Sequence, residues 1–101
     1  MYASIRQYRV IDDPSEAVQR ISEGFVPIVR EVPGFSAWYL LVSDDGSITT
    51  VTVCDDRAGV EASVSRASSW VLKNLGDVIQ GPPSVVNGEV KADARRGDER
   101  P

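Results

Sequence analysis

The pattern of hydrophobic and polar residues predicts four strands and two helices. Four segments are rich in the β-branched and aromatic residues that strands favour: 2–10, 35–43, 47–55 and 84–92. Apolar residues recur every three or four positions between Val18 and Val32 and again between Val60 and Leu75, which is the spacing of a helix that covers a core. The chain is therefore expected to be an α+β domain with the order strand, helix, strand, strand, helix, strand.

Local signals set the predicted boundaries of these elements. The run Asp13-Pro14-Ser15-Glu16 is typical of a helix start, because Asp13 can cap and Pro14 fits the first helical position. Pro27 should kink this helix, since proline removes one backbone hydrogen bond. The second helix is expected over about 57–75, with Asp55 or Asp56 as its cap.

The Asp45-Gly46 pair predicts a hairpin between the second and third strands. If these two residues form the centre of the turn, Trp38 lies opposite Val53 and Leu40 opposite Val51. Alternation then divides the strand residues between two faces. The face expected under the helices carries mostly apolar side chains, namely Ala3, Ile5, Trp38, Leu40, Val42, Val51, Val53, Val86 and Val90.

The other face also carries apolar and aromatic side chains, although no helix remains to cover it. The expected contacts to a second copy of the chain across this face are Arg6, Tyr8, Tyr39, Leu41, Thr50 and Thr52. Because exposed apolar patches of this size usually mark a contact, we expect a homodimer through the sheet. The alternative is a mixed, solvated sheet face that happens to hold a few tyrosines.

Length and charge narrow the function classes. A chain of 101 residues provides one domain, expected over 1–92, followed by a charged, disordered tail over 93–101. The net charge of -4 is unlike the basic surface that nucleic acids require, so no nucleic-acid partner is expected. The sequence shows neither a leader peptide nor a membrane-spanning run, and we expect a cytoplasmic protein without a membrane partner.

The chain contains no histidine and a single cysteine, Cys54. It therefore offers no imidazole base, no histidine-bearing triad and no histidine ligand for zinc or haem. The aspartate pairs lie where turns and helix starts are expected, which accounts for them without a metal. We expect neither a metal nor a bound cofactor.

Several segments resemble one known family. The opening YASIRQYRV, the run Phe25-Val26-Pro27-Ile28, the Pro33-Gly34-Phe35 entry into the second strand and Trp70 in the second helix are similar to the dimeric α/β-barrel superfamily. Within it the chain resembles small proteins related to antibiotic biosynthesis monooxygenases. The resemblance implies a ferredoxin-like fold with an antiparallel sheet and two helices on one face, a homodimer, and a pocket between sheet and helices.

The resemblance also frames the functional alternatives. Some relatives oxidise aromatic polyketide-like substrates without a bound cofactor, and others degrade haem with a histidine ligand that this chain lacks. The residues expected to contact a small hydrophobic or aromatic ligand are Trp38, Trp70 and Asn74. The alternative for the two tryptophans is that they pack in the core. The alternative for Asn74 is a helix cap or a solvent contact.

Two functions remain open. A cofactor-independent monooxygenase should have a cavity of roughly 300 Å³ or more on which a polar group converges. A small homodimer that binds a small molecule or is non-catalytic should have the two tryptophans closing the space and should leave no convergent polar groups. The missing histidine favours the second.

Overall fold

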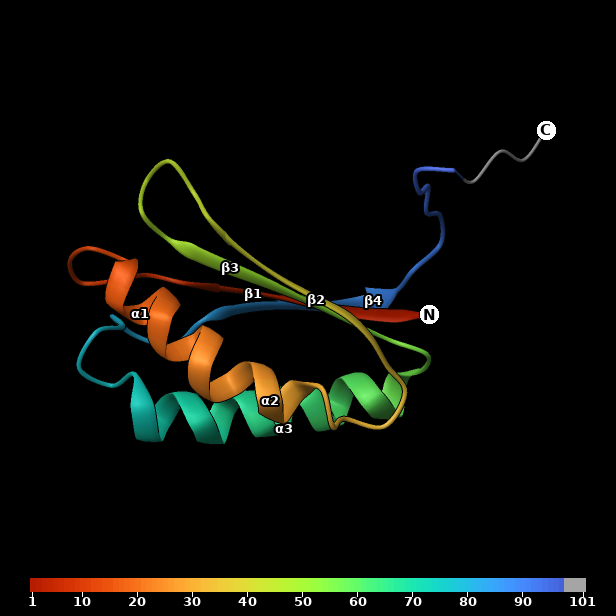
Figure 1. The fold of residues 1–101 in the computed structure, drawn as a ribbon, viewed down its shortest axis with the longest axis horizontal. Helices are drawn as coiled ribbons and strands as arrows, with labels where there is room; N and C mark the ends of the chain where they lie inside the picture. The colour runs from red at the N-terminus through yellow and green to blue at the C-terminus, as the bar shows by residue number, and fades with distance from the viewer. Residues whose placement is uncertain (98–101) are drawn as a thin grey trace.

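The protein consists of one antiparallel sheet with helices on one face, as Figure 1 shows for the computed structural model. Residues 1–97 are described by the structure, and the last four positions of the predicted tail lie outside the described residues. The strand order is β2-β3-β1-β4, which is the ferredoxin-like topology, so the predicted fold class is confirmed. The elements are β1 (Tyr2–Tyr8), α1 (Ser15–Arg20), η1 (Ile21–Phe25), α2 (Val26–Val29), β2 (Phe35–Val42), β3 (Ile48–Cys54), α3 (Arg57–Asn74) and β4 (Ser84–Glu89).

The first helical arm has three parts because its hydrogen bonding changes midway. The Asp13 carboxylate accepts from the backbone N–H of Ser15 at 2.9 Å, as the expected capping role requires. A π-helical turn, η1, follows α1 and ends where Val26 N–H bonds to the carbonyl of Ile21. Pro27, which has no N–H to donate, is the second residue after this turn. The arm buries Phe25 and other apolar side chains against the sheet.

Helix α3 lies close to the sheet because of one glycine. The Asp56 side chain caps the helix by accepting from the N–H of Gly59 at 3.1 Å. A Cβ atom at Gly59 would stand 2.5 Å from the carbonyl oxygen of Pro33, so only glycine fits there. Val60, Ser63 and Ala67 continue the buried face of α3. No helix in residues 1–97 is both long and apolar enough to cross a membrane.

The hairpin between β2 and β3 has a three-residue loop, so the predicted two-residue turn is wrong. Ser43 N–H bonds to the carbonyl of Ser47, and Gly46 N–H bonds to the carbonyl of Ser43. Gly46 has φ of +86°, the left-handed conformation that closes loops of this length. Trp38 therefore pairs with Thr52, and Leu40 with Thr50, one position away from the predicted partners.

The predicted faces of β1, β3 and β4 are reversed, because a one-residue slip moves every side chain of a strand to the other side of the sheet. Val86, predicted under the helices, pairs with Ile5 on the opposite face. Buried Arg6, Tyr8, Thr50 and Thr52 lie under the helices and cannot contact a second copy through the opposite face. Their assignment to a dimer interface was wrong. In β2, Trp38 and Leu40 pack against the helix-side core as predicted.

The face away from the helices carries a continuous apolar row. We call it the open face, defined by the directly paired residues Tyr39, Val51, Ile5 and Val86 of the four strands. Tyr39 is 62% exposed and Val86 is 65% exposed. No helix or strand of residues 1–97 covers this face (Figure 1). The segment after β4 borders it, because Asp93 and Arg95 line a shallow pocket together with Tyr39 and Val53.

Candidate functional site

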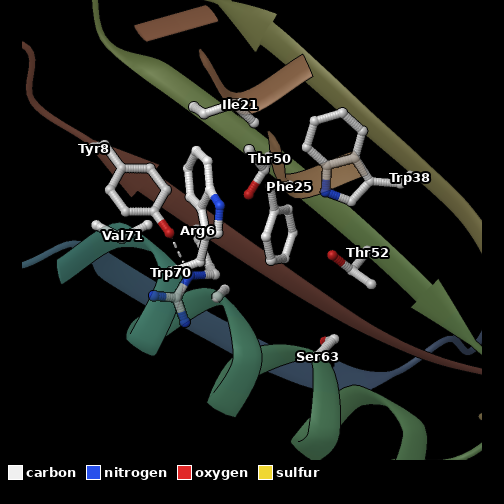
Figure 2. A pocket seen from close by; sticks show the side chains of 11 residues that line it. Arg6, Tyr8, Ile21, Phe25, Trp38, Thr50, Thr52, Ser63, Trp70 and Val71 are labelled. Carbon is white, nitrogen blue, oxygen red and sulfur yellow. Dashed lines mark hydrogen bonds between the residues drawn. The ribbon is translucent and has the colours of Figure 1, made fainter. Parts of the chain in front are cut away.

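A small cavity lies between the sheet, the π-helical turn and α3 (Figure 2). Its volume is about 20 Å³, which is room for a single water molecule. Strands β1, β2 and β3, helix α3 and η1 all contribute to its lining. Its walls divide into an aromatic part and a polar part.

Phe25, Trp38 and Trp70 form the aromatic wall. The Phe25 ring lies between the two indoles, with ring centres 6.4 Å from Trp38 and 5.8 Å from Trp70 and tilts of 54° and 52°. These tilted arrangements are the favourable ones for aromatic pairs. The structure thus places Trp38 and Trp70 beside one cavity, and their contact with a ligand stays a prediction.

Trp70 also packs against the first helical arm. A Cβ atom at Gly24 would stand 2.6 Å from Cζ2 of Trp70, so the indole occupies space that any other residue at position 24 would fill. Trp70 is only partly buried, in contrast to Phe25, which is 6% exposed. The indole therefore lies at the border between the cavity and the surface.

The polar wall consists of Arg6 and four hydroxyl groups. Arg6 Nε donates to Tyr8 Oη at 2.7 Å, and the guanidinium lies 5.6 Å from the centre of the Tyr8 ring. The hydroxyl-bearing residues that line the cavity are Tyr8, Thr50, Thr52 and Ser63. Ser63 Oγ donates to the carbonyl of Val60, which fixes its orientation. The wall is thus rich in groups that can donate hydrogen bonds.

Arg6 is a buried cation without a carboxylate beside it. Arg6 is 5% exposed. No carboxylate of an Asp or Glu in residues 1–97 lies within 4.0 Å of its guanidinium nitrogens. Besides the bond to Tyr8, its only other side-chain partner among these residues is Ser68 Oγ, at a long 3.5 Å. Burial of a charge is costly unless the charge is paired. Because Ser68 is an exposed residue, the guanidinium reaches towards the protein surface at this end.

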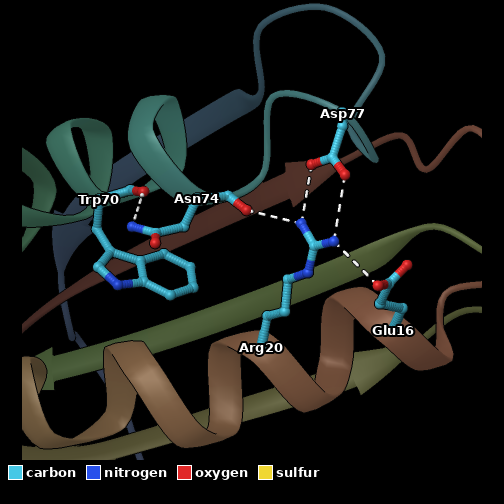
Figure 3. Close-up of polar contacts among 5 residues, drawn as sticks. All are labelled: Glu16, Arg20, Trp70, Asn74 and Asp77. Carbon is cyan, nitrogen blue, oxygen red and sulfur yellow. Dashed lines mark hydrogen bonds and ion pairs between the residues drawn. The ribbon is translucent and has the colours of Figure 1, made fainter.

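Asn74, the third predicted ligand contact, lies outside the cavity. Its side-chain nitrogen donates to the Trp70 carbonyl at 2.8 Å, one turn back along α3 (Figure 3). The Asn74 carbonyl accepts from Arg20 Nη1 at 2.9 Å. Asn74 is exposed and is the last residue of α3, which agrees with the alternative given for it, a cap or a solvent contact.

Arg20 connects the first helical arm to the end of α3. It pairs with Asp77 at 2.8 Å and with Glu16 at 2.9 Å (Figure 3). The hydrogen bond from Arg20 holds the pKa of Asp77 below its ordinary value of 3.8. These contacts tie together the two helical elements that carry Phe25 and Trp70.

Cys54 and the acidic residues offer no further chemistry. Burial raises the pKa of the Cys54 thiol, and the nearby charges of Asp55 and Asp56 raise it further, so the thiol stays protonated at neutral pH. Across residues 1–97, no three His, Cys, Asp or Glu side chains gather closely enough to hold a metal ion.

Comparisons with known proteins agree with this architecture. No family model and no curated protein matches the sequence. Solved structures do match, among them NE2512 of Nitrosomonas europaea, a protein of unknown function (18% identity, 93% of this chain and 92% of that chain, TM-score 0.75). A monooxygenase from the ActVA-Orf6 gene of Streptomyces coelicolor, solved with nanaomycin D, is 20% identical (93% and 90%, TM-score 0.73). SnoaB of Streptomyces nogalater, a cofactor-independent oxygenase, is 14% identical (91% and 94%, TM-score 0.73).

The chain has the fold of antibiotic biosynthesis monooxygenases. The resemblance inferred from the sequence is thereby confirmed at the level of the fold. At identities of 14–20%, these likenesses show the antibiotic biosynthesis monooxygenase fold alone and assign no activity to this chain.

The first prediction concerns the charge of Arg6. Tyr8→Phe removes the hydroxyl that accepts the 2.7 Å bond from Arg6 Nε, so the guanidinium loses a hydrogen-bond acceptor. This loss should lower the free energy of unfolding by about 1–3 kcal/mol. The double variant Arg6→Met/Tyr8→Phe removes both partners and should be more stable than Tyr8→Phe alone. Urea denaturation of the parent and the two variants measures this, and a double variant less stable than Tyr8→Phe would contradict it.

The second prediction concerns the ion pair between Arg20 and Asp77. The pKa of Asp77 is lower in the folded state than in the unfolded state, so the pair contributes fully at neutral pH and is lost as the pH falls below 3.8. Asp77→Asn should lower the melting temperature at pH 7, and its difference from the parent should vanish in acid. Glu16→Gln, which leaves the Asp77 contact in place, is the matched control, and an unchanged difference at low pH would refute the assignment.

Proposed function

We propose that this protein binds a small planar aromatic molecule that carries an oxygen function. The observation that carries the proposal is the meeting of a three-ring aromatic wall with a buried arginine that has no carboxylate partner in residues 1–97. The ligand ring would pack against the aromatic wall of Phe25, Trp38 and Trp70, and its oxygen would accept from Arg6. Ligand pockets typically combine such apolar walls with a few placed polar groups.

The size of the cavity requires the pocket to open when a ligand enters. A volume of about 20 Å³ matches the closed space expected of the binding protein, whereas the convergence of Arg6 and Tyr8 matches what an enzyme would need. The partly buried indole of Trp70 is the side chain whose displacement would enlarge the space. Its neighbour Gly24 has no side chain that would obstruct the movement.

Cofactor-independent oxygenation is the second candidate function, and the Arg6–Tyr8 pair is the observation that favours it. A cation beside a ring oxygen stabilises the phenolate, and that electron-rich form reacts with oxygen more readily than the neutral phenol. The balanced reaction is phenol plus O₂ to quinone plus water, with the ring oxidised and O₂ reduced. Similarity of the fold to SnoaB, described as a cofactor-independent oxygenase, supports this candidate.

The open face is proposed to pack against a second copy of the chain. Its central row crosses all four strands, and Leu41 adds another half-exposed apolar side chain beside Tyr39. Covering the face with a symmetric copy would remove apolar surface from water at about 25 cal/mol per Å². Of the interface residues predicted from sequence, Tyr39 and Leu41 support this proposal, because both are exposed on the open face.

The third prediction tests this interface. Tyr39→Glu places a charge in the centre of the open face and should convert a 22 kDa dimer, twice the 11.0 kDa chain, into monomers. Leu72→Glu is the matched control, because Leu72 is 81% exposed on α3, away from the sheet. Sedimentation at micromolar concentration measures the masses. A parent chain that sediments at 11 kDa would reject the dimer.

The fourth prediction tests the pocket by filling it. Ala67 lines the cavity from α3, so Ala67→Leu should block a ring from entering and weaken binding at least tenfold. Ala58→Leu is the control, since position 58 is an exposed alanine of the same helix. Heteronuclear NMR titration with 4-nitroanisole follows the two indole N–H signals of Trp38 and Trp70. If neither signal moves in the parent protein, the proposed function is wrong.

A further inference from the structure

The first helical arm and α3 meet at two neighbouring contacts. In one, Gly24 of η1 packs on the indole of Trp70, where a Cβ atom would stand 2.6 Å from Cζ2. In the other, Arg20 donates to the backbone carbonyl of Asn74 at 2.9 Å. Residues four apart lie on the same side of a helix, so each contact is about one turn away from the other on both elements. Arg20 therefore acts directly beside the contact that closes the cavity.

Arg20 holds its contact with a fork of hydrogen bonds. Nη1 donates to Asp77 Oδ1 at 2.8 Å, and Nη2 donates to Asp77 Oδ2 at 3.2 Å (Figure 3). Among residues 1–97, Arg20 makes every hydrogen bond that joins α1 or η1 to α3 and the turn after it. We call the group formed by Arg20, Asp77 and the Asn74 carbonyl the latch.

The strength of the latch suits a contact that breaks and forms again. Ion pairs at the surface usually contribute little to stability, but a bidentate pair between arginine and a carboxylate is an exception. The side chains of Arg20 and Asp77 are 33% and 66% exposed, so water and salt can compete for both groups. The latch is thus strong enough to slow a separation of the two helical elements and too weak to prevent it.

A separation of these elements is what the cavity needs in order to admit a ring. Its volume is about 20 Å³, and it is lined by Ile21 and Phe25 from η1 and by Trp70 and Val71 from α3. The π-helical turn η1 interrupts the regular hydrogen bonding of the arm, and Pro27, two residues later, has no N–H to donate. The arm is therefore suited to bend at this place and to carry η1 away from Trp70.

Building on the proposed function, we propose that the latch gates the pocket: Arg20 releases Asp77 and the Asn74 carbonyl whenever a ligand enters or leaves. The latch forms again around the bound ligand, so it is present in both closed states and absent only from the open one. Arg20 is then a positioning residue that does not touch the ligand. An interaction that is equal in the free and bound states changes the rates of binding and release but not the affinity.

Stopped-flow fluorescence with the uncharged probe 4-nitroanisole tests the gate. Asp77→Asn should raise the association and dissociation rate constants by the same factor, about threefold, and leave the affinity unchanged. Glu16→Gln is the matched control, because Glu16 pairs with Arg20 within α1 and its loss keeps the bonds to α3. Added salt should speed binding and release in the parent but not in Asp77→Asn, since screening acts on the exposed ion pair. The NMR spectrum of each variant verifies that it is folded.

A second measurement needs no ligand. The chain has two tryptophans, so in a Trp38→Phe background the fluorescence comes from Trp70 alone. Acrylamide quenches an indole that is uncovered, and adding Asp77→Asn to this background should raise the quenching rate constant about twofold. Adding Glu16→Gln instead should leave it unchanged.

The outcomes separate the gate from the proposed function. Unchanged rate constants in Asp77→Asn would overturn the gate, and so would a faster dissociation alone, because the latch would then act on the bound state. Unchanged quenching of Trp70 overturns the gate whatever the rates are. If 4-nitroanisole does not bind to the parent protein, the proposed function fails, and the quenching of Trp70 alone decides whether the latch controls the opening of the cavity.

Discussion

The register between β2 and β3 decides which side chains meet inside this protein. It is fixed by the three-residue loop, where Ser43 and Ser47 close the hairpin and Asp45 accepts from the Ser47 N–H at 2.9 Å. This register places Thr50 and Thr52 on the same side of the sheet as Trp38. The pairing of β3 with β1 then extends the same side to Arg6, which lies opposite Thr50. The polar wall and the aromatic wall of the cavity therefore both depend on one short loop.

The sequence predicted the order of the elements, the cap of the first helix and the sides of β2 on which Trp38 and Tyr39 lie. It failed for the faces of β1, β3 and β4 for two reasons. The Asp45-Gly46 pair suits a two-residue turn as well as the observed loop, and that difference of one residue reverses a strand. Hydrophobicity also favoured the wrong side, because Ile5, Val51 and Val86 are more apolar than Arg6, Thr50 and Thr52, which the helices cover.

The apolar row on the outside of the sheet and the polar residues under the helices affect the stability of the domain. A domain that used its more apolar sheet face as its own core would gain more from burial than this one does. Instead the helices cover Arg6, Thr50 and Thr52, and the apolar row is left on the outside. Retaining polar groups in the interior lowers stability and is typical of sites shaped for binding or chemistry. In the proposed dimer, the second copy would supply the burial that the open face lacks.

The balance between stability and a site suited to binding also explains why the cavity is small. Burial of Arg6 already lowers the stability of the domain. An empty pocket of ligand size would lower it further, because the side chains around the pocket would lose van der Waals contacts. Trp70 limits this cost by filling most of the space against Gly24, while Asn74 and Arg20 hold the backbone of its helix in place. A ligand would then exchange one set of ring contacts for another as the indole moves. The net gain from binding would come from the charge of Arg6, a residue that is 5% exposed and has no carboxylate within 4.0 Å in residues 1–97.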